Sequence, residues 1–263
     1  TSLFLSLIIY AKKRKNTFFL AKKLAFFLFL CYNNPRYCFL PNGGSILNSS
    51  GYRRVKLACY ATNISMSVMG NLPPLLFLTF RSLYDISFSL LGLLVLINFC
   101  TQLAVDLVFS FFSHKFNIPM TVKLTPVLTV AGLLLYVLAP FLFPSNVYLG
   151  LVLGTVVFSA SSGLAEVLIS PVIAAIPAKD PDGEMSKLHS MYAWGVVGVV
   201  ILSTLFLLVF GSTNWMYLAL FWSIVPLTAF LTFLKSKLPE MNNFGETQKQ
   251  TKIFSKGIVL CAV

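Results

Sequence analysis

Six long apolar runs dominate the sequence and restrict what the chain can fold into. They contain 20 to 30 residues each and lie at 57–80, 86–112, 122–143, 147–176, 190–210 and 215–234. A helix needs about 20 apolar residues to cross a hydrocarbon layer of about 30 Å, because each residue adds about 1.5 Å. The runs are continuous and do not alternate with polar residues, so they are not barrel strands. The sequence therefore predicts an all-α membrane protein with a bundle of six transmembrane helices.

The overall composition agrees with a protein that lies in lipid. Hydrophobic residues make up 57% of the chain and charged residues only 11%, whereas a soluble domain has about 25% charged residues. The net charge of +12 would in a polar chain favour nucleic-acid binding. In a chain this apolar we expect membrane lipids as partners and no nucleic acid.

The basic residues between the runs predict how the bundle is oriented. From residue 52 onward, twelve Lys and Arg residues fall on one side of the predicted membrane, and only Arg81 falls on the other. Cytoplasmic loops are enriched in Lys and Arg. We therefore expect both ends of the bundle in the cytoplasm and the protein in the plasma membrane (the cell inner membrane). The twelve are Arg53, Arg54, Lys56, Lys115, Lys123, Lys179, Lys187, Lys235, Lys237, Lys249, Lys252 and Lys256.

The chain divides into four parts. Residues 1–51 contain seven basic residues and no acidic one; a signal peptide and a polybasic lipid-binding arm are alternatives, and we favour a disordered or non-native extension upstream of the true start. Residues 52–234 form the bundle, and 235–256 form a polar cytoplasmic linker. Residues 257–263 begin a truncated seventh helix, so we expect the chain to be a fragment.

Two acidic residues lie inside the apolar runs, Glu166 and Asp106. A charged side chain near the centre of a membrane helix costs about 2.5–3.5 kcal/mol, so one that persists there usually faces a cavity, a partner or a pathway. No Lys or Arg lies in the core of any run to neutralise Glu166, which must be protonated or hydrated and suits proton-coupled transport. Asp106 lies near a helix end, where a loop contact and a transport role are both open.

Three runs also carry polar or small residues along one helical face. We expect these faces to converge on a wet interior. Close helix packing is the favoured alternative for the small residues Ser67, Gly70, Ser159 and Gly163, and interhelical hydrogen bonding is an equal alternative for the amides. The candidate residues for substrate binding and proton coupling are Glu166, Asn63, Asn71, Asn98, Gln102 and Tyr192.

Other residues carry weaker predictions. Pro73 and Pro74 predict a kink at the outer end of the first run, and Trp215 is expected in an interfacial aromatic belt. The histidines, His114 and His189, fall on different predicted connections, and the five cysteines lack metal-ligand spacing. We therefore expect no metal, no cofactor and no enzymatic activity.

Two segments resemble a known family. Gly163-Leu164-Ala165-Glu166 with Pro171 five positions after the acid, and the run from Leu188 to Gly195, resemble the sugar (fucose) permease branch of the major facilitator superfamily. The resemblance is to its N-terminal half only. It implies a proton-coupling role for Glu166 and a gating role for Asp106. The chain has Gln102 where the signature loop of this superfamily has glycine, and it has Asn63 or Asn71 where fucose permeases carry an acid.

The sequence and the resemblance together predict a secondary active transporter that works by alternating access. We expect it to be proton-coupled and to carry a small solute, with a sugar as one candidate; symport and antiport are both open. The expected partners are the solute, protons and the missing C-terminal six-helix half of the same chain. The alternative is a six-helix channel or a non-transporting membrane scaffold protein.

Overall fold

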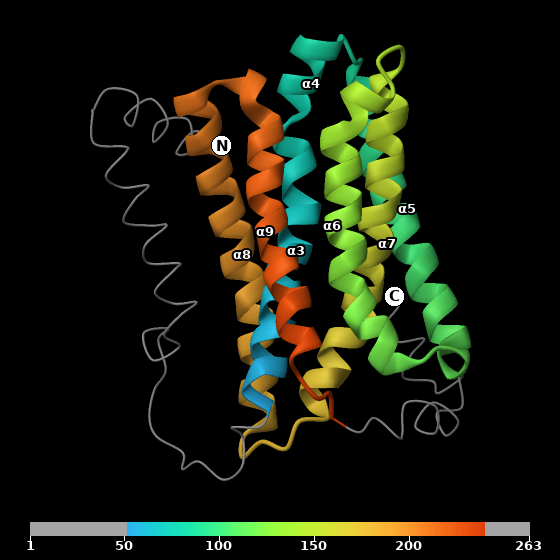
Figure 1. The fold of residues 1–263 in the computed structure, drawn as a ribbon, viewed down its shortest axis with the longest axis vertical. Coiled ribbons are helices and arrows are strands. Elements are labelled where there is room, and N and C mark those ends of the chain that lie inside the picture. Colours follow the sequence, from blue (N-terminus) through green and yellow to red (C-terminus); the bar gives the residue numbers. More distant parts are fainter. Residues whose placement is uncertain (1–51, 240–263) are drawn as a thin grey trace, which may run out of the picture.

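Helices account for nearly all of residues 52–239, which are the residues that the computed structural model describes (Figure 1). This part of the chain has seven α-helices and no β-strand. The helices are α3 (Arg53–Leu75), α4 (Phe77–Tyr84), α5 (Phe88–Phe112), α6 (Ile118–Leu142), α7 (Val147–Ala174), α8 (Pro181–Phe210) and α9 (Trp215–Leu234), with two 3₁₀ turns, η2 (Ser113–Lys115) and η3 (Ser212–Asn214). The predicted extension 1–51, most of the linker and the start of a seventh helix lie outside the described residues.

Five of the helices, α5 to α9, are long and apolar enough to cross a membrane. The chain is thus a multi-span helical membrane protein. The first predicted run behaves differently, since α3 ends at Leu75 and the short α4 starts at Phe77. Pro73 and Pro74 lie in the last turn of α3, and the Leu76 N–H bonds to the Leu72 and Pro73 carbonyls at 3.3 and 3.0 Å. The predicted kink is confirmed, and it divides the run into two helices.

The start of α8 corrects the prediction for the loop before it. The apolar run begins at residue 190, but the helix begins at Pro181, nine residues earlier. Asp180 accepts a hydrogen bond from the Gly183 N–H at 2.9 Å, proline suits the first helical position, and Asp182 and Glu184 lie in the first turn, where negative charge is favourable. The prediction that His189 lies on a connection is therefore wrong, because the residue lies inside α8.

The helices pack around a central pair, α3 and α7. The main partners of α3 are α8 and α9, the main partners of α7 are α5 and α6, and α6 also packs against α9. Figure 1 shows α6 and α9 side by side on the face toward the viewer. In the part of the chain that the structure describes, α5 and α8 do not pack extensively against each other. One side of the bundle therefore lies between α5 and α8, and α3 and α7 form the layer behind this side.

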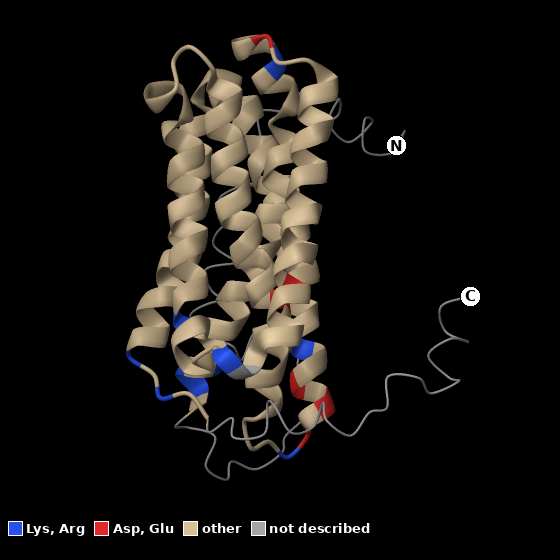
Figure 2. Cartoon of the chain, turned by 90° about the vertical axis from the view of Figure 1, so that its right-hand side faces the viewer, with Lys and Arg blue, Asp and Glu red and all other residues tan. Residues whose placement is uncertain are grey.

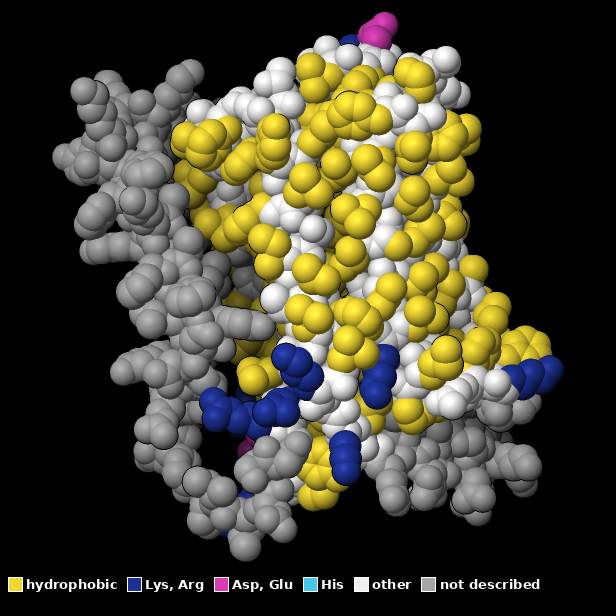
Figure 3. Space-filling view, viewed as in Figure 1, with side chains coloured by type: hydrophobic (Ala, Val, Ile, Leu, Met, Phe, Trp, Pro, Cys, Tyr) yellow, Lys and Arg dark blue, Asp and Glu magenta, His cyan; other side chains and the backbone are white. Residues whose placement is uncertain are grey.

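The surface separates apolar and charged side chains along the bundle. Figure 3 shows hydrophobic side chains covering the face of α6 and α9, with Lys and Arg gathered toward one end. In Figure 2 the Lys and Arg residues lie toward the two ends of the bundle, whereas acidic residues lie both at the ends and within its lower half. In the described residues, Arg81 is the one basic residue in the end formed by α4, and it lies beside Asp85 at the C-cap of that helix. This distribution agrees with the predicted sidedness.

Glycines bring α6 and α7 close together. A Cβ atom at Gly132 would lie 2.6 Å from the Phe158 backbone nitrogen, and one at Gly154 would lie 2.9 Å from that of Tyr136. Such contacts leave no space for a side chain. Close backbone approach is the usual way in which helices gain packing energy in lipid, where no hydrophobic effect drives them together.

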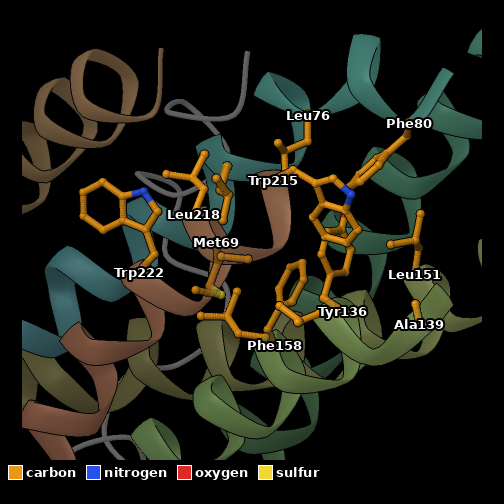
Figure 4. Close-up of a cluster of buried hydrophobic side chains, with 14 of the residues drawn as sticks. Met69, Leu76, Phe80, Tyr136, Ala139, Leu151, Phe158, Trp215, Leu218 and Trp222 are labelled. Carbon is orange, nitrogen blue, oxygen red and sulfur yellow. The ribbon is translucent and has the colours of Figure 1, made fainter. Parts of the chain in front are cut away.

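An aromatic cluster lies between α4, α6, α7 and α9 (Figure 4). Trp215 is fully buried there, with its ring centre 5.0 Å from that of Phe80 in an edge-on contact. Tyr136 contacts Phe80, Phe158 and Trp215 in the same way. The expectation that Trp215 belongs to an interfacial belt is wrong, because this position at the start of α9 faces the other helices.

We predict that Gly132→Ala destabilises the bundle while Gly92→Ala does not. The new methyl group at residue 132 meets the α7 backbone, whereas no heavy atom lies within 4 Å of a Cβ built at Gly92. Overpacking of this kind costs about 1–3 kcal/mol. The measurement is the thermal unfolding midpoint of each purified variant in detergent, and equal midpoints for both variants would contradict the packing described.

Candidate functional site

A cavity of about 530 Å³ lies among α3, α5, α7 and α8. This volume lies in the range of sites for small molecules. All six residues predicted to bind substrate or protons line it, and they come from all four helices. They are Asn63 and Asn71 of α3, Asn98 and Gln102 of α5, Glu166 of α7, and Tyr192 of α8. The predicted convergence of the polar faces is therefore present in the structure.

One wall of the cavity, formed by α5 and α7, carries the acid. The Gln102 side-chain amide donates a hydrogen bond to the Glu166 carboxylate at 2.5 Å. Closer to the start of both helices, the Ser159 hydroxyl donates to the Asn98 amide oxygen at 2.5 Å. Gly163 permits this approach, because a Cβ atom there would lie 2.8 Å from the Gln102 carbonyl oxygen. In the described residues, no Lys or Arg forms an ion pair with Glu166, so Gln102 is its recorded partner.

The second wall is formed by α3 and α8. The Asn63 side-chain amide donates to the Leu188 carbonyl at 2.6 Å and so joins the two helices. Further along, a Cβ atom at Gly195 would collide with the Ser67 hydroxyl, so the two backbones are close there. The Asn71 amide donates to the Ser67 carbonyl of its own helix at 2.8 Å. Three of the four predicted amides therefore bond across helices, and all four also line the cavity.

The small residues divide between packing and lining. Ser67, Ser159 and Gly163 are buried at helix contacts, which confirms the packing interpretation for them. Gly70 is different because it is exposed and lines the cavity. Among the described residues of the other helices, the one atom within 4 Å of a Cβ built there is the Tyr192 hydroxyl oxygen, at 3.9 Å. The packing interpretation of Gly70 is therefore wrong.

Asp106 is not among the residues that line the cavity. It lies one helical turn after Gln102, where a Cβ atom at Gly163 would be 2.9 Å from its Oδ1 atom. This Oδ1 atom is buried and has no hydrogen-bond partner in the described part of the chain. The gating role of Asp106 stays a prediction.

Sequence interpretation missed His189, which lines the cavity from α8. It was assigned to a polar connection because the apolar run starts one residue later. The pattern that would have placed it is Asp180-Pro181 followed by Asp182 and Glu184, which is typical of a helix start. With the helix extended to residue 181, His189 and Tyr192 fall three residues apart on one face.

An ion-pair cluster joins α3 and α8 near the charged end. The Glu184 carboxylate lies 3.0 Å from the Lys56 ammonium and 3.1 Å from that of Lys187. The Tyr60 hydroxyl donates to the same carboxylate at 3.2 Å. Because the Glu184 side chain is only 18% exposed, this Glu184 cluster helps to hold the α3–α8 wall together.

The groups in the cavity suit recognition of a small polar solute. Amides donate and accept hydrogen bonds, the carboxylate accepts them, and the imidazole and the phenol can do both. Among the described residues that line the cavity there is no Lys or Arg. No cluster of His, Cys, Asp and Glu in residues 52–239 has the arrangement of a metal site.

Comparisons of the chain with protein-family models, with curated proteins and with solved structures find no match.

We predict that Glu184→Gln lowers the stability of the bundle by about 1–3 kcal/mol, because it leaves Lys56 and Lys187 without their carboxylate partner. Asp182→Asn is the matched control, since Asp182 lies exposed in the same first turn. Chemical denaturation of the purified variants in detergent measures the difference. A loss that is no larger for Glu184→Gln than for the control would show that the Glu184 cluster contributes no stability.

Proposed function

We propose that the chain forms the N-terminal six-helix half of a secondary active transporter of the major facilitator kind. In this proposal the transporter works by alternating access and couples the movement of a small polar solute to protons. A sugar is one candidate solute, in line with the resemblance of residues 163–171 and 188–195 to sugar permeases. Both ends of the bundle face the cytoplasm, as the gathered Lys and Arg residues favour.

The pairing of the helices supports this proposal. The six helices can be divided into two units of three, in which α3 is matched with α7, α5 with α8, and α6 with α9. Under this matching the packed pair α3–α8 corresponds to the packed pair α5–α7, and the pair α6–α7 corresponds to the pair α3–α9. The pairs α3–α7 and α6–α9 each contain two matched helices and so correspond to themselves. All of these are main packing pairs of the bundle. In this proposal α3 is the sixth span, so each unit has three spans and the second unit runs in the opposite direction through the membrane. Inverted repeats of three helices are typical of each half of a major facilitator transporter.

The observation that carries the proposal is the position of the cavity in this arrangement. Its two walls are the equivalent pairs α3–α8 and α5–α7, so it lies where the two repeats meet. Substrate and coupling-ion sites of transporters occur at such repeat interfaces. A structural bundle has no need for a carboxylate and several amides around a shared cavity, because polar groups inside a membrane are costly.

In the proposed mechanism Glu166 carries the proton. Its carboxyl group lines the cavity, and no described Lys or Arg forms an ion pair with it, so protonation removes a charge that is costly inside a membrane. Gln102 holds the side chain toward α5 and can donate to it in its ionised form. Release of the proton restores the carboxylate and changes the hydrogen bonds that Glu166 offers to a solute. A second six-helix half, packed over the side between α5 and α8, would alternate the access to this cavity.

We predict that Glu166→Gln abolishes proton-driven uptake. The full-length protein is reconstituted in liposomes, a pH gradient is imposed, and the uptake of a panel of labelled neutral monosaccharides is measured. The wild type is expected to accumulate at least one member of the panel. The Gln variant can still bond to Gln102 but cannot exchange a proton. Its accumulation should therefore fall to the level reached without a gradient.

Asp182→Asn serves as the control, because it removes an exposed acid outside the cavity by the same chemical change. Gradient-driven uptake that survives in Glu166→Gln would remove the coupling role of Glu166. Ion conductance without saturable uptake would favour the channel alternative, and the absence of both would favour the scaffold.

A further inference from the structure

We infer that His189 binds the transported solute directly, as the counterpart on the α3–α8 wall of Glu166 on the α5–α7 wall. The inference rests on the proposed function and adds to it a residue that contacts the solute. It follows from where the start of α8 places His189, from how α8 is held against α3, and from the free hydrogen-bonding groups of the imidazole.

The position of His189 is set by the interactions that precede and follow it. Asp180 caps the helix, and the Glu184 cluster fastens its first turn to α3. Leu188, directly before His189, is buried and accepts the Asn63 hydrogen bond at 2.6 Å. With Leu188 held against α3, the next residue along the helix turns to the cavity, and His189 lines it.

The imidazole has no recorded protein partner. The structure gives no hydrogen bond or ion pair from the His189 side chain to any other described residue, and the residue is exposed where it lines the cavity. Asn63, Asn98 and Gln102 line the same cavity, but each uses at least one polar atom of its side chain in a hydrogen bond between helices. On this wall, His189 and Tyr192 are the lining side chains of the described residues that have polar atoms and make no hydrogen bond at all.

The two walls offer complementary chemistry to a neutral solute with several hydroxyl groups. The ionised carboxylate of Glu166 only accepts hydrogen bonds, whereas a neutral imidazole donates one and accepts one. The cavity of about 530 Å³ has room for a solute that touches both walls. Loss of one such hydrogen bond weakens binding by about tenfold.

The test uses a reporter thiol, so that it measures binding and not transport. Gly70→Cys is introduced into the full-length protein after its native cysteines are replaced by alanine. Gly70 lines the cavity, and a Cβ there lies 3.9 Å from the Tyr192 hydroxyl, with no closer atom from another described helix. The rate of reaction with a cationic methanethiosulfonate reagent is measured in membranes with increasing concentrations of each neutral monosaccharide of the panel. The concentration that halves the rate reports the affinity of the cavity.

With His189 present, we expect at least one monosaccharide to slow the reaction. His189→Ala should raise the half-protecting concentration about tenfold, and His189→Gln should raise it less, because its amide still donates and accepts. Ser190→Ala is the matched control and should leave it unchanged, since the Ser190 hydroxyl bonds to the Ser186 carbonyl of its own helix. A change in labelling without any sugar reports altered folding and is measured first for every variant.

Protection that is equally strong in His189→Ala and in Ser190→Ala would overturn the inference, as would the absence of protection by every member of the panel. Protection that depends on His189 in a protein that shows no uptake would support the binding role and would contradict the proposed transport. The two proposals therefore fail in distinguishable ways.

Discussion

Polar groups inside a membrane must find partners within the protein, because lipid offers none. In this bundle the requirement decides which helix faces meet. Glu166 bonds to Gln102, Asn98 accepts from Ser159, and Asn63 bonds to the Leu188 carbonyl. These bonds join α5 to α7 and α3 to α8. The apolar faces of α6 and α9 have no such requirement for polar partners, and they cover another side of the molecule.

Glycine placement has a second, separate effect on the arrangement. Gly132 and Gly154 bring α6 and α7 into contact, and Gly163 and Gly195 do the same for α5–α7 and α3–α8. Contacts this close allow side chains as short as those of Asn63 and Ser159 to bond across helices. The cavity is what remains between the two joined pairs, and the longer side chains of Glu166, His189 and Tyr192 reach into it.

Much of the fold and of the site followed from periodicity and composition. Four of the five long apolar helices begin and end within a few residues of the predicted runs, because continuous apolar stretches of this length have few other stable forms. The six predicted lining residues meet in one cavity, because polar residues at helical spacing mark the face that avoids lipid. The errors have local causes. Hydropathy does not register the Asp180-Pro181 cap, so the start of α8 and with it His189 were misplaced. The aromatic neighbours of Trp215 belong to α4 and α6, and their approach could not be read from residues around position 215.

The sequence by itself determined that this chain is a helical membrane protein with one polar face on each of several helices. This is a local property, since an apolar run has to form a helix in lipid and a polar residue in it has to turn away from lipid. The tertiary structure decided which polar faces form one cavity and which residues pack instead of lining it. Ser159 and Gly163 are buried by the crossing of α5 and α7, Gly70 remains open to the cavity, and Asp106 lies beside it. These differences depend on where two helices approach each other, and that approach is set by residues far apart in the chain.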